Sequence, residues 1–442
     1  MHTGTTPVGR ARTADVAVIG GGLAGLTAAT VLARTGRRVL LFEKSRTLGG
    51  RAVTHAHGDF RFNIGPHALY KAGPAMEILR DLGIPFTGGT PAVSGAYALD
   101  GGTTHTLPGG FVSLLTTGLL RLSAKFELAR LLGAVQKIDT DAIQHASVRQ
   151  WLDSVLEQPD VRRLVQALLR LSTYANDPDR QSAGAAVAQL QAAARSGVMY
   201  LDGGWQVLVD GLHAAARAAG VEVESAVRVT AVEHDTMVRG VGLADGTRVA
   251  ASSVVIAAAP SDAAALLPGS SAVRTWSAAA IPVRAACLDV ALSRLPNPRA
   301  TFALGIDVPL YFSVHSAVAT LAAPGGATIH AAKYLPTEGS SDPKADERQL
   351  EAVYDLLQPG WRAAVVERRF LPSMVVYNAL VTADGGGLAG RPGPAIPDVD
   401  GAYVAGDWVG PEGGLADTSL ASARRAAQMI LHRSARHAAA AA

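Results

Sequence analysis

Apolar residues in the first fifty positions of the chain predict a strand, a helix and a second strand. Residues 15–19 (DVAVI) form a short, mostly apolar and β-branched run, which is typical of a buried parallel strand. After the hexapeptide GGGLAG at residues 20–25, a mostly apolar segment predicts a helix that ends at Gly36, a good helix stop. Residues 37–42 (RRVLLF) then predict a second strand, which Glu43 follows directly.

The patterns farther along the chain separate into a helical block and a strand-like block. Residues 90–200 are largely helical in pattern, whereas residues 281–380 contain several strand-like runs and one helix at 345–357. We therefore expect an α/β fold, in which a nucleotide-binding unit is joined to a mixed sheet with a helical cap. The apolar segment 107–134 has two readings: a helical pair packed on the core, or a surface that touches a membrane.

Composition narrows the class of protein. Of 442 residues, 48% are hydrophobic and 17% are charged, so a large core is available and wholesale disorder is excluded. The formal charge of +3 and the lack of a Lys/Arg run argue against a nucleic-acid partner. Cys287 is the single cysteine, so no disulfide forms within the chain and no metal site is expected. Neither a secretory signal nor a membrane-spanning run stands out, and we expect a cytoplasmic protein.

The hexapeptide at residues 20–25 has the Gly-x-Gly-x-x-Gly spacing of a dinucleotide-binding turn. The predicted strand before it, the helix and second strand after it, and the acid Glu43 are the surroundings that this motif requires. Gly20 permits the tight turn, Gly22 lets the backbone approach a pyrophosphate, and Gly25 allows close packing of helix on strand. The helix N-terminus offers free N–H groups to phosphate. Glu43 is placed to accept hydrogen bonds from an adenosine ribose.

The segment after Glu43 decides which dinucleotide is expected. In KSRTLGGRA (44–52), Gly49 and Gly50 precede Arg51, and a guanidinium pairs well with phosphate oxygens. The βαβ unit followed by LGGR resembles the superfamily of flavin amine oxidases, phytoene desaturases and related FAD-dependent oxidoreductases. In that superfamily the second glycine pair and its Arg lie along the FAD pyrophosphate.

The resemblance covers much of the chain. FNIGPHALY (62–70) is similar to the segment beside the isoalloxazine ring, and LDGGWQVLVDGL (201–212) to the segment that returns to the FAD domain. Val227 matches by position the residue whose backbone contacts adenine. Residues 401–431 match the C-terminal flavin motif. The motifs GPH and AGDWVGP are most similar to those of the phytoene desaturase and retinol saturase-like branch.

Domain boundaries and cofactor contacts follow from this resemblance. We expect a discontinuous FAD domain at residues 13–89, 200–280 and 391–434, a substrate domain at 90–199 and 281–390, and flexible tails at 1–12 and 435–442. The expected non-covalent FAD contacts are Gly20, Gly22, Leu23, Ala24, Gly25, Glu43, Lys44, Gly50, Arg51, Ala52, Gly65, Pro66, His67, Val227, Ala258, Gly406, Asp407, Gly414, Leu415 and Ala416.

The C-terminal motif also predicts chemistry from its own residues. A short strand at 403–405 leads into Gly406 and Asp407, whose carboxylate can hydrogen-bond the ribityl or pyrophosphate region. Gly413 and Gly414 then precede a helix with apolar positions at helical spacing. Its positive N-terminal end would face the N1–C2=O edge of a flavin, where negative charge appears on two-electron reduction.

GGGLAG occurs a second time, at residues 385–390, in different surroundings. No apolar strand abuts it, and Pro392, Pro394 and Pro397 follow it. Because a helix cannot run through prolines at that spacing, we expect a loop between the domains that holds no phosphate. A role near the substrate entrance is a secondary reading.

Catalytic groups are harder to identify, because flavin dehydrogenation often needs little acid–base help. His67 is the candidate: it could orient the flavin or the substrate, accept a proton, or simply be satisfied by backbone bonds. Further pocket candidates are Tyr70, Tyr311, His315, Tyr377 and Glu412, each also explained by a structural role. Cys287 lies outside the C-terminal motif, so a thioether to the flavin is not expected.

The main hypothesis is an FAD oxidoreductase that introduces or removes a C–C double bond in a small, largely apolar molecule. Oxygen, a quinone or another acceptor would reoxidise the flavin. The alternatives are an amine or amino-acid oxidase, an NAD(P)H-dependent saturase, and a non-catalytic flavin-binding partner subunit. Membrane contact is expected to be peripheral at most, and the sequence does not indicate an oligomeric state.

Overall fold

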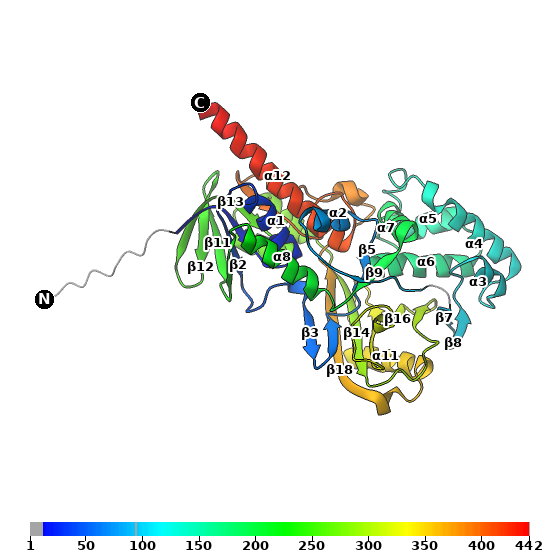
Figure 1. Cartoon of the computed structure of the whole chain (residues 1–442). Coiled ribbons are helices and arrows are strands. Elements are labelled where there is room, and N and C mark those ends of the chain that lie inside the picture. Colours follow the sequence, from blue (N-terminus) through cyan, green and yellow to red (C-terminus); the bar gives the residue numbers. More distant parts are fainter. Residues whose placement is uncertain (1–11, 93–94, 442) are drawn as a thin grey trace.

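Two seven-stranded sheets organise the protein, of which this computed structural model describes residues 12–92 and 95–441 (Figure 1). The first sheet has the order β10-β2-β1-β13-β12-β11, with β19 paired to β13. Its strands are β1 (Arg12–Ile19), β2 (Val39–Glu43), β10 (Glu222–Ser225), β11 (Val229–His234), β12 (Val238–Leu243), β13 (Arg248–Ile256) and β19 (Ala402–Val404). β10, β2, β1, β13 and β19 run parallel, and β11 and β12 form an antiparallel edge.

Helices cover both faces of this sheet, which is why its strands read as continuous apolar runs. One face packs against α1 (Leu23–Ala33), α2 (Pro74–Asp81), α8 (Gln206–Ala218) and α12 (Leu415–Ala441). The other face packs against α9 (Pro260–Leu266) and α10 (Ser271–Ala279). The predicted α/β fold with a Rossmann-type unit is therefore confirmed, although α1 ends at Ala33 and Gly36 lies in the following turn at φ +82°.

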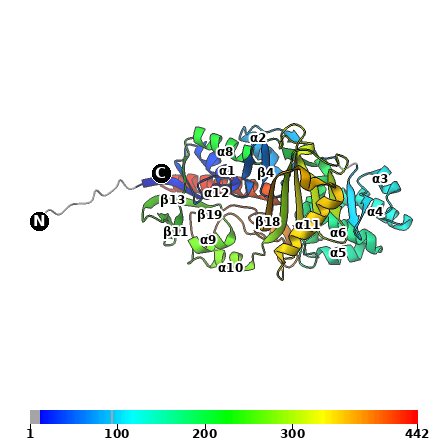
Figure 2. The same ribbon diagram turned by 90° about the horizontal axis from the view of Figure 1, so that it is seen from below.

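The second sheet is antiparallel except for one parallel pair, and has the order β18-β14-β17-β16-β15-β7-β8. Its strands are β7 (Tyr97–Asp100), β8 (Thr103–Thr106), β14 (Val283–Leu292), β15 (Phe302–Gly305), β16 (Leu310–Val314), β17 (Ala327–Tyr334) and β18 (Val365–Tyr377). Helix α11 (Pro343–Leu357) packs on the face away from the first sheet, and Figure 2 shows β18 standing between α11 and the first sheet.

The helical cap consists of α3 (Phe111–Thr116), α4 (Leu122–Ala134), α5 (Val148–Val155), α6 (Pro159–Thr173) and α7 (Ala183–Ser196). The expectation that residues 90–200 are largely helical missed β7 and β8. These two strands form a hairpin across Gly101 and Gly102, which take φ +58° and +72°. A two-glycine turn between the short runs YALD and TTHT was the available signal.

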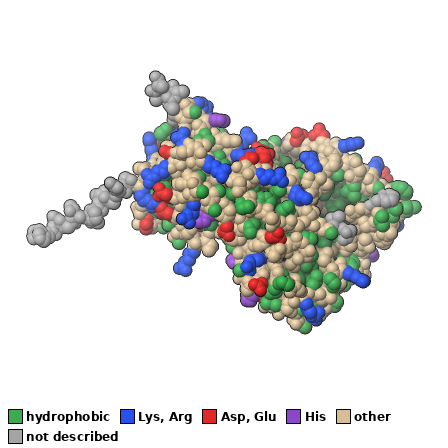
Figure 3. All heavy atoms as spheres, viewed as in Figure 1, with side chains coloured by type: hydrophobic (Ala, Val, Ile, Leu, Met, Phe, Trp, Pro, Cys, Tyr) green, Lys and Arg blue, Asp and Glu red, His purple; other side chains and the backbone are tan. Residues whose placement is uncertain are grey.

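The apolar segment 107–134 is only partly buried. Leu120, Ala124 and Leu128 pack into the cap, whereas Val112, Leu115, Leu122 and Phe126 are exposed. Figure 3 shows hydrophobic side chains on the surface at the end of the molecule where α3 and α4 lie. No helix in the described part of the chain is long and apolar enough to cross a membrane.

Short elements connect the two lobes. They are the hairpin β3 (Thr54–His57) and β4 (Phe60–Asn63), and the small sheet of β5 (Leu69–Tyr70), β9 (Val198–Leu201) and β6 (Gly88–Gly89). The expected N-terminal tail falls on residues 1–11, which lie outside the described residues, and on Arg12, which begins β1. At the other end, α12 continues to Ala441, so residues 435–441 are helical where a tail was expected.

Candidate functional site

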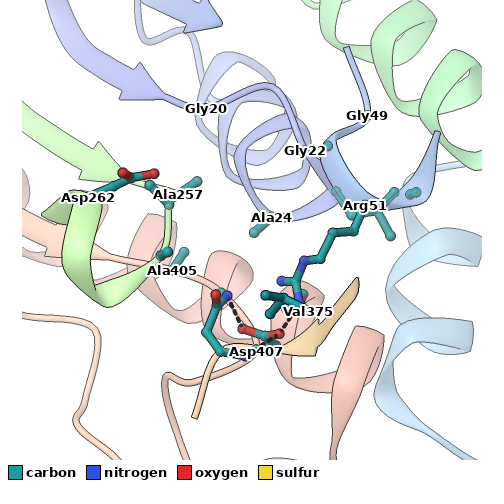
Figure 4. A pocket seen from close by; sticks show the side chains of 18 of the residues that line it. Gly20, Gly22, Ala24, Gly49, Arg51, Ala257, Asp262, Val375, Ala405 and Asp407 are labelled. Atoms are coloured by element: carbon teal, nitrogen blue, oxygen red, sulfur yellow. Dashed lines mark hydrogen bonds and ion pairs between the residues drawn. The ribbon is translucent and has the colours of Figure 1, made fainter. Parts of the chain in front are cut away.

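A cavity of about 690 Å³ lies at the carboxyl ends of the parallel strands. Residues that directly follow β1, β2, β13 and β19 line it, namely Gly20, Lys44, Ala257 and Ala405. Ligands of open α/β sheets bind at this edge, because the strand ends and the helix N-termini converge there. Figure 4 shows Gly20, Ala257 and Ala405 around this cavity.

The first GGGLAG forms the turn between β1 and α1, and its glycines serve different purposes. Gly20 takes φ +107°, and a Cβ there would lie 2.4 Å from the carbonyl oxygen of Ala257. A Cβ on Gly25 would lie 1.8 Å from the oxygen of Gly20, so both glycines are required by the protein itself. Gly22 differs, because the nearest atom to its Cβ position is the oxygen of Gly49 at 3.8 Å. Its open side faces the cavity, where a phosphate could approach the backbone.

Glu43 closes the β2 end of the cavity and is buried. Its carboxylate accepts the backbone N–H groups of Gly21 and Ser45, both at 2.7 Å. Each oxygen retains a further lone pair, so hydrogen bonds from a ribose remain available. Val227 lines the same end, and its N–H donates to the Glu43 carbonyl at 2.9 Å, which leaves its own carbonyl for an adenine.

Arg51 reaches across the cavity from the short 3-10 helix Gly50–Ala52 (Figure 4). Its Nη1 donates to Asp407 Oδ2 at 2.6 Å and to the Val376 carbonyl at 2.7 Å. Asn378 Nδ2 donates to the other Asp407 oxygen at 2.8 Å. Asp407 is only 2% exposed, so its carboxylate holds Arg51 rather than presenting itself to a ligand. The remaining guanidinium donors of Arg51 are available to a phosphate.

The N-terminus of α12 forms another wall. Leu415, Ala416 and Ser419 line the cavity, and Leu415 takes φ +56°, a strained backbone conformation for a residue with a Cβ. Asp417 points the other way and accepts the N–H of Ala75 at the start of α2, at 2.9 Å. Burial raises the pKa of Asp417 to about 6, although that hydrogen bond opposes the shift.

His67 lies in the wall between the two lobes. Its Nδ1 and Nε2 lie 3.1 Å from the carbonyl oxygens of Gly65 and Arg51, respectively. Burial lowers the pKa of His67 to about 4, so the ring is neutral at pH 7 and donates to only one carbonyl. Trp205 packs edge-on against it at 5.0 Å between ring centroids. With both nitrogens turned to backbone oxygens, His67 is better placed to orient a ligand than to take a proton from it.

Most of the sequence-predicted contacts line this one cavity. Those that line it are Gly20, Gly22, Leu23, Ala24, Glu43, Lys44, Gly50, Arg51, Ala52, Pro66, His67, Val227, Ala258, Gly406, Asp407, Leu415 and Ala416. Gly25, Gly65 and Gly414 do not. A Cβ on Gly65 would meet Cys287 Sγ at 2.9 Å, and one on Gly414 would meet Gln189 Oε1 at 2.6 Å, so these glycines pack against protein.

The other pocket candidates take structural positions. Tyr70 donates its hydroxyl to the Ser172 carbonyl at 2.7 Å, and Tyr311 and His315 bond each other at 3.0 Å; neither they nor the buried Tyr377 lines the cavity. Glu412 lies 3.7 Å from Arg425 at the surface.

Sequence reasoning missed the lining residues Tyr174, Trp205, Met374 and Asn378. Trp205 was within reach, since it follows the Gly203-Gly204 pair.

The second GGGLAG forms no part of the cavity. It makes a 3-10 helix, Gly387–Gly390, instead of an α-helix, as its prolines predict. Gly387 takes φ +63°, and its Cβ position lies 2.8 Å from Gln144 Cβ and 3.1 Å from Ser182 Oγ. The loop therefore packs against the start of α7.

The cavity fits a flavin dinucleotide on three observations. No atom lies closer than 3.8 Å to the Cβ position of Gly22 or of Gly50, both of which line the cavity. The acid Glu43 lies at the end of β2, and Arg51 reaches Asp407 across the middle. In addition, the buried Trp205 Nε1 has no hydrogen-bond partner among the described residues, although Trp205 lines the cavity. A cofactor would satisfy such a donor.

Comparisons with known proteins agree with this geometry. The family model for flavin-containing amine oxidoreductases matches residues 23–284. A carotenoid 3,4-desaturase of Haloarcula japonica is 52% identical over 52 residues, 12% of this chain and 10% of the relative. An L-amino acid oxidase of Crotalus durissus cumanensis is 40% identical over 70 residues, 16% of this chain and 14% of the relative. The matched segments thus span only a small part of these relatives' length.

Solved structures show the same fold over nearly the whole chain. An oxidoreductase from Methanosarcina mazei superposes with a TM-score of 0.73 at 17% identity, covering 94% of this chain and 99% of that one. The fold and the cavity define a flavin-dependent oxidoreductase. Because the family model matches more than half of the residues, the chain belongs to the flavin-containing amine oxidoreductase family.

Proposed function

We propose that this enzyme binds FAD without a covalent bond and is a desaturase or dehydrogenase of a small, largely apolar molecule. When bound, the flavin supplies a hydride acceptor or donor at N5, opposite a C–H bond of the substrate. The short stretch shared with a carotenoid desaturase supports this substrate class. The resemblance of the GPH and AGDWVGP motifs to the phytoene desaturase branch supports it too.

The observation that carries the proposal is the distribution of charge in the cavity. Lys44 pairs with Asp262 at 3.2 Å at the end formed by the first sheet, and Arg228 lines the same cavity. Arg51 and Asp407 pair with each other in the middle. The end between the lobes is lined by Tyr174, Trp205, Met374, Val376 and Leu415, with His67 as its only titratable imidazole. An amine or a carboxylate there would lack a free counter-charge among the lining residues, and burying it would be costly.

Each wall contributes a defined task. The backbone of residues 20–25 and the α12 N-terminus present N–H groups to negative charge. Arg51, held by Asp407, is positioned for the pyrophosphate, and Glu43 for the ribose. His67, Trp205 and Leu415 orient the ring system and exclude water from the substrate.

Non-covalent binding is supported by the position of the single cysteine. Cys287 is buried in β14 with its Sγ against Gly65, and it does not line the cavity. We further propose oxygen, a quinone or another small acceptor for reoxidation, and peripheral membrane contact at most. A cytoplasmic location belongs to the same proposal.

An amine or amino-acid oxidase is the second candidate, favoured by the family match and by the L-amino acid oxidase relative. It predicts that amines bleach the flavin and release peroxide. The lack of a free counter-charge at the end of the cavity between the lobes argues against an amine substrate. An NAD(P)H-dependent saturase predicts that a reduced nicotinamide such as NADPH bleaches the flavin. A non-catalytic partner subunit predicts bound FAD that no donor reduces.

Anaerobic reduction of the purified protein separates these readings. We expect a yellow protein that releases FAD on acid precipitation, and whose flavin is bleached by members of a panel of hydrocarbons but not by amines or amino acids. Arg51→Ala should lower FAD retention, with exposed Arg46→Ala as the matched control. A colourless protein without affinity for FAD would overturn the proposal, and bleaching by amines alone would replace it with the second candidate.

A further inference from the structure

Exposed apolar side chains cluster on the helical cap. Seven large hydrophobic residues are exposed in the described part of the chain, and four of them lie within residues 112–126. These four are Val112, Leu115, Leu122 and Phe126, which are 53–72% exposed. Exposed apolar residues that are scattered singly need no explanation, whereas a cluster of them is typical of a surface that contacts a partner.

The four residues belong to one surface formed by α3 and α4, the α3–α4 surface. Lys125 Nζ on α4 donates to the carbonyl oxygen of Leu115 on α3 at 2.6 Å, so α3 is held beside the middle of α4. Figures 1 and 2 both show α3 and α4 side by side at the end of the cap farthest from the first sheet. None of the four residues lines the cavity of the candidate site. The α3–α4 surface therefore projects from one end of the molecule.

Helix α4 has two apolar sides, and only one of them packs on the protein. Ala124 and Leu128 are fully buried in the core of the cap. Leu122, Phe126 and Ala129 recur at helical spacing on the opposite side, and all three are exposed. Because the first side already anchors the helix, packing within the chain does not explain the second side.

Cations stand on both sides of the exposed apolar stripe of α4. At 3.6 residues per turn, Arg121 and Lys125 lie on one side of the stripe and Arg130 lies on the other. Glu127 is the one acid of residues 111–134. Its two oxygens accept backbone N–H groups just before α6, at 2.7 and 3.0 Å. The α3–α4 surface thus combines apolar side chains with a net positive charge.

This combination selects one kind of partner. Helices that lie in the interface of a bilayer insert an apolar stripe among the headgroups, and Lys and Arg beside the stripe pair with anionic lipid phosphates. A second copy of the chain is a poorer partner, because a symmetric contact would bring the same cations together.

We propose that the α3–α4 surface docks the enzyme on an anionic lipid bilayer, into which its four exposed apolar side chains insert. The inference deepens the proposed function and rests on it for its purpose, since a largely apolar substrate dissolves in the same bilayer. Binding of this kind is reversible and depends on lipid charge and on salt.

Co-sedimentation of the FAD-loaded protein with lipid vesicles tests the inference. Vesicles of phosphatidylcholine mixed with phosphatidylglycerol are compared with vesicles of phosphatidylcholine alone, at low and at high salt. We expect binding to the anionic vesicles, about tenfold weaker binding to the neutral vesicles, and release by salt. Equal binding to both kinds of vesicle, or no binding to either, would overturn the inference.

Paired substitutions then locate the surface. Leu122→Gln together with Phe126→Gln should weaken binding to anionic vesicles about tenfold, because two apolar side chains no longer insert. Leu356→Gln together with Val366→Gln is the matched control, since these residues are 45% and 42% exposed on α11 and β18. The control should bind as wild type does, and both variants should keep the melting temperature of the wild-type protein. Equal binding by the two variants contradicts the assignment.

A fluorescent label reports whether the surface enters the bilayer. Phe126→Cys introduces an accessible thiol, whereas the native Cys287 is buried. An environment-sensitive dye at residue 126 should shift its emission to the blue when anionic vesicles are added, and the same dye on Leu356→Cys should not. Binding without a shift at residue 126 would mean attachment by charge alone, which contradicts insertion.

The outcomes also separate this inference from the proposed function. A protein that holds FAD but ignores vesicles contradicts only the docking surface, whereas a colourless protein that binds vesicles contradicts only the flavin assignment. A dimer in gel filtration that Leu122→Gln together with Phe126→Gln converts to a monomer would replace the bilayer with a second copy of the chain.

Discussion

The two copies of GGGLAG close their turns in the same way and differ in the middle. In each, the last glycine lies over the oxygen of the first: a Cβ would be 1.8 Å from it on Gly25 and 1.5 Å on Gly390. Gly22 has an open side toward the cavity, whereas Gly387 takes φ +63° and faces Gln144 at 2.8 Å. Six identical residues therefore line an open cavity in one place and form a packed loop in the other.

The difference comes from the flanking residues. The first copy follows the buried strand β1 and continues into α1, so its free N–H groups gather at a helix N-terminus. The second copy is followed by prolines and makes only a 3-10 turn, packed on the start of α7. A motif of this kind is thus informative about binding only with its strand and helix in view.

The largest effect that separates the copies is expected at Gly22. Gly22→Leu should lower FAD affinity at least about 100-fold, roughly 3 kcal/mol, because the new side chain occupies the space of the pyrophosphate. The folded protein itself has room there, so its melting temperature without cofactor should stay nearly constant. Calorimetric titration with FAD and thermal unfolding measure the two quantities. Equal loss of stability and affinity would show that Gly22 serves the fold instead.

A substitution at Gly387 is expected to act on stability and not on affinity. Gly387→Ala places a side chain in the left-handed region and against Gln144, which should cost about 1–3 kcal/mol of unfolding free energy. FAD affinity of the folded protein should remain within about twofold of wild type. Gly393→Ala is the matched control, since no atom lies within 4 Å of its Cβ position. A large loss of FAD affinity in Gly387→Ala would remove the contrast between the copies.

The smallest expected effect concerns the pH dependence of stability. It arises from Asp417, an acid near the cavity that hydrogen-bonds the protein backbone at Ala75. Because the folded-state pKa of Asp417 is raised to about 6, the folded protein binds this proton more tightly than the unfolded chain. The free energy of unfolding should therefore fall as pH rises from about 4 to 6, on the order of 2 kcal/mol. Asp417→Asn should flatten this window and stabilise the protein at pH 7. Urea unfolding at several pH values measures it, and an unchanged pH profile would contradict the assignment.

The part of the cavity formed by the first GGGLAG, Glu43 and Arg51 was predictable because its signals are local. The strand before Gly20, the helix after Gly22, the acid Glu43 and the glycine pair before Arg51 all lie within one short segment, and spacing fixes their geometry. The hairpin of β7 and β8 was missed although the turn at Gly101 and Gly102 indicates it, because strands of four residues are a weak signal. That β7 also pairs with the distant β15 had no local signal at all.

The sequence alone distinguishes the two copies of GGGLAG. The prolines that follow residues 385–390 exclude an α-helix there, whereas the strand–helix–strand pattern around residues 20–25 requires one. The sequence also determined the glycine-rich turn at residues 20–25, and its single cysteine, Cys287, excludes a disulfide within the chain. Only the tertiary structure decided that Asp407 holds Arg51, that both His67 nitrogens meet carbonyl oxygens, and that Arg369, Asp289 and His330 are neighbours in the second sheet. Arg51 and Asp407 are 356 residues apart, and Arg369 and Asp289 are 80 apart. Their pairing depends on burial and on neighbours that no local pattern contains.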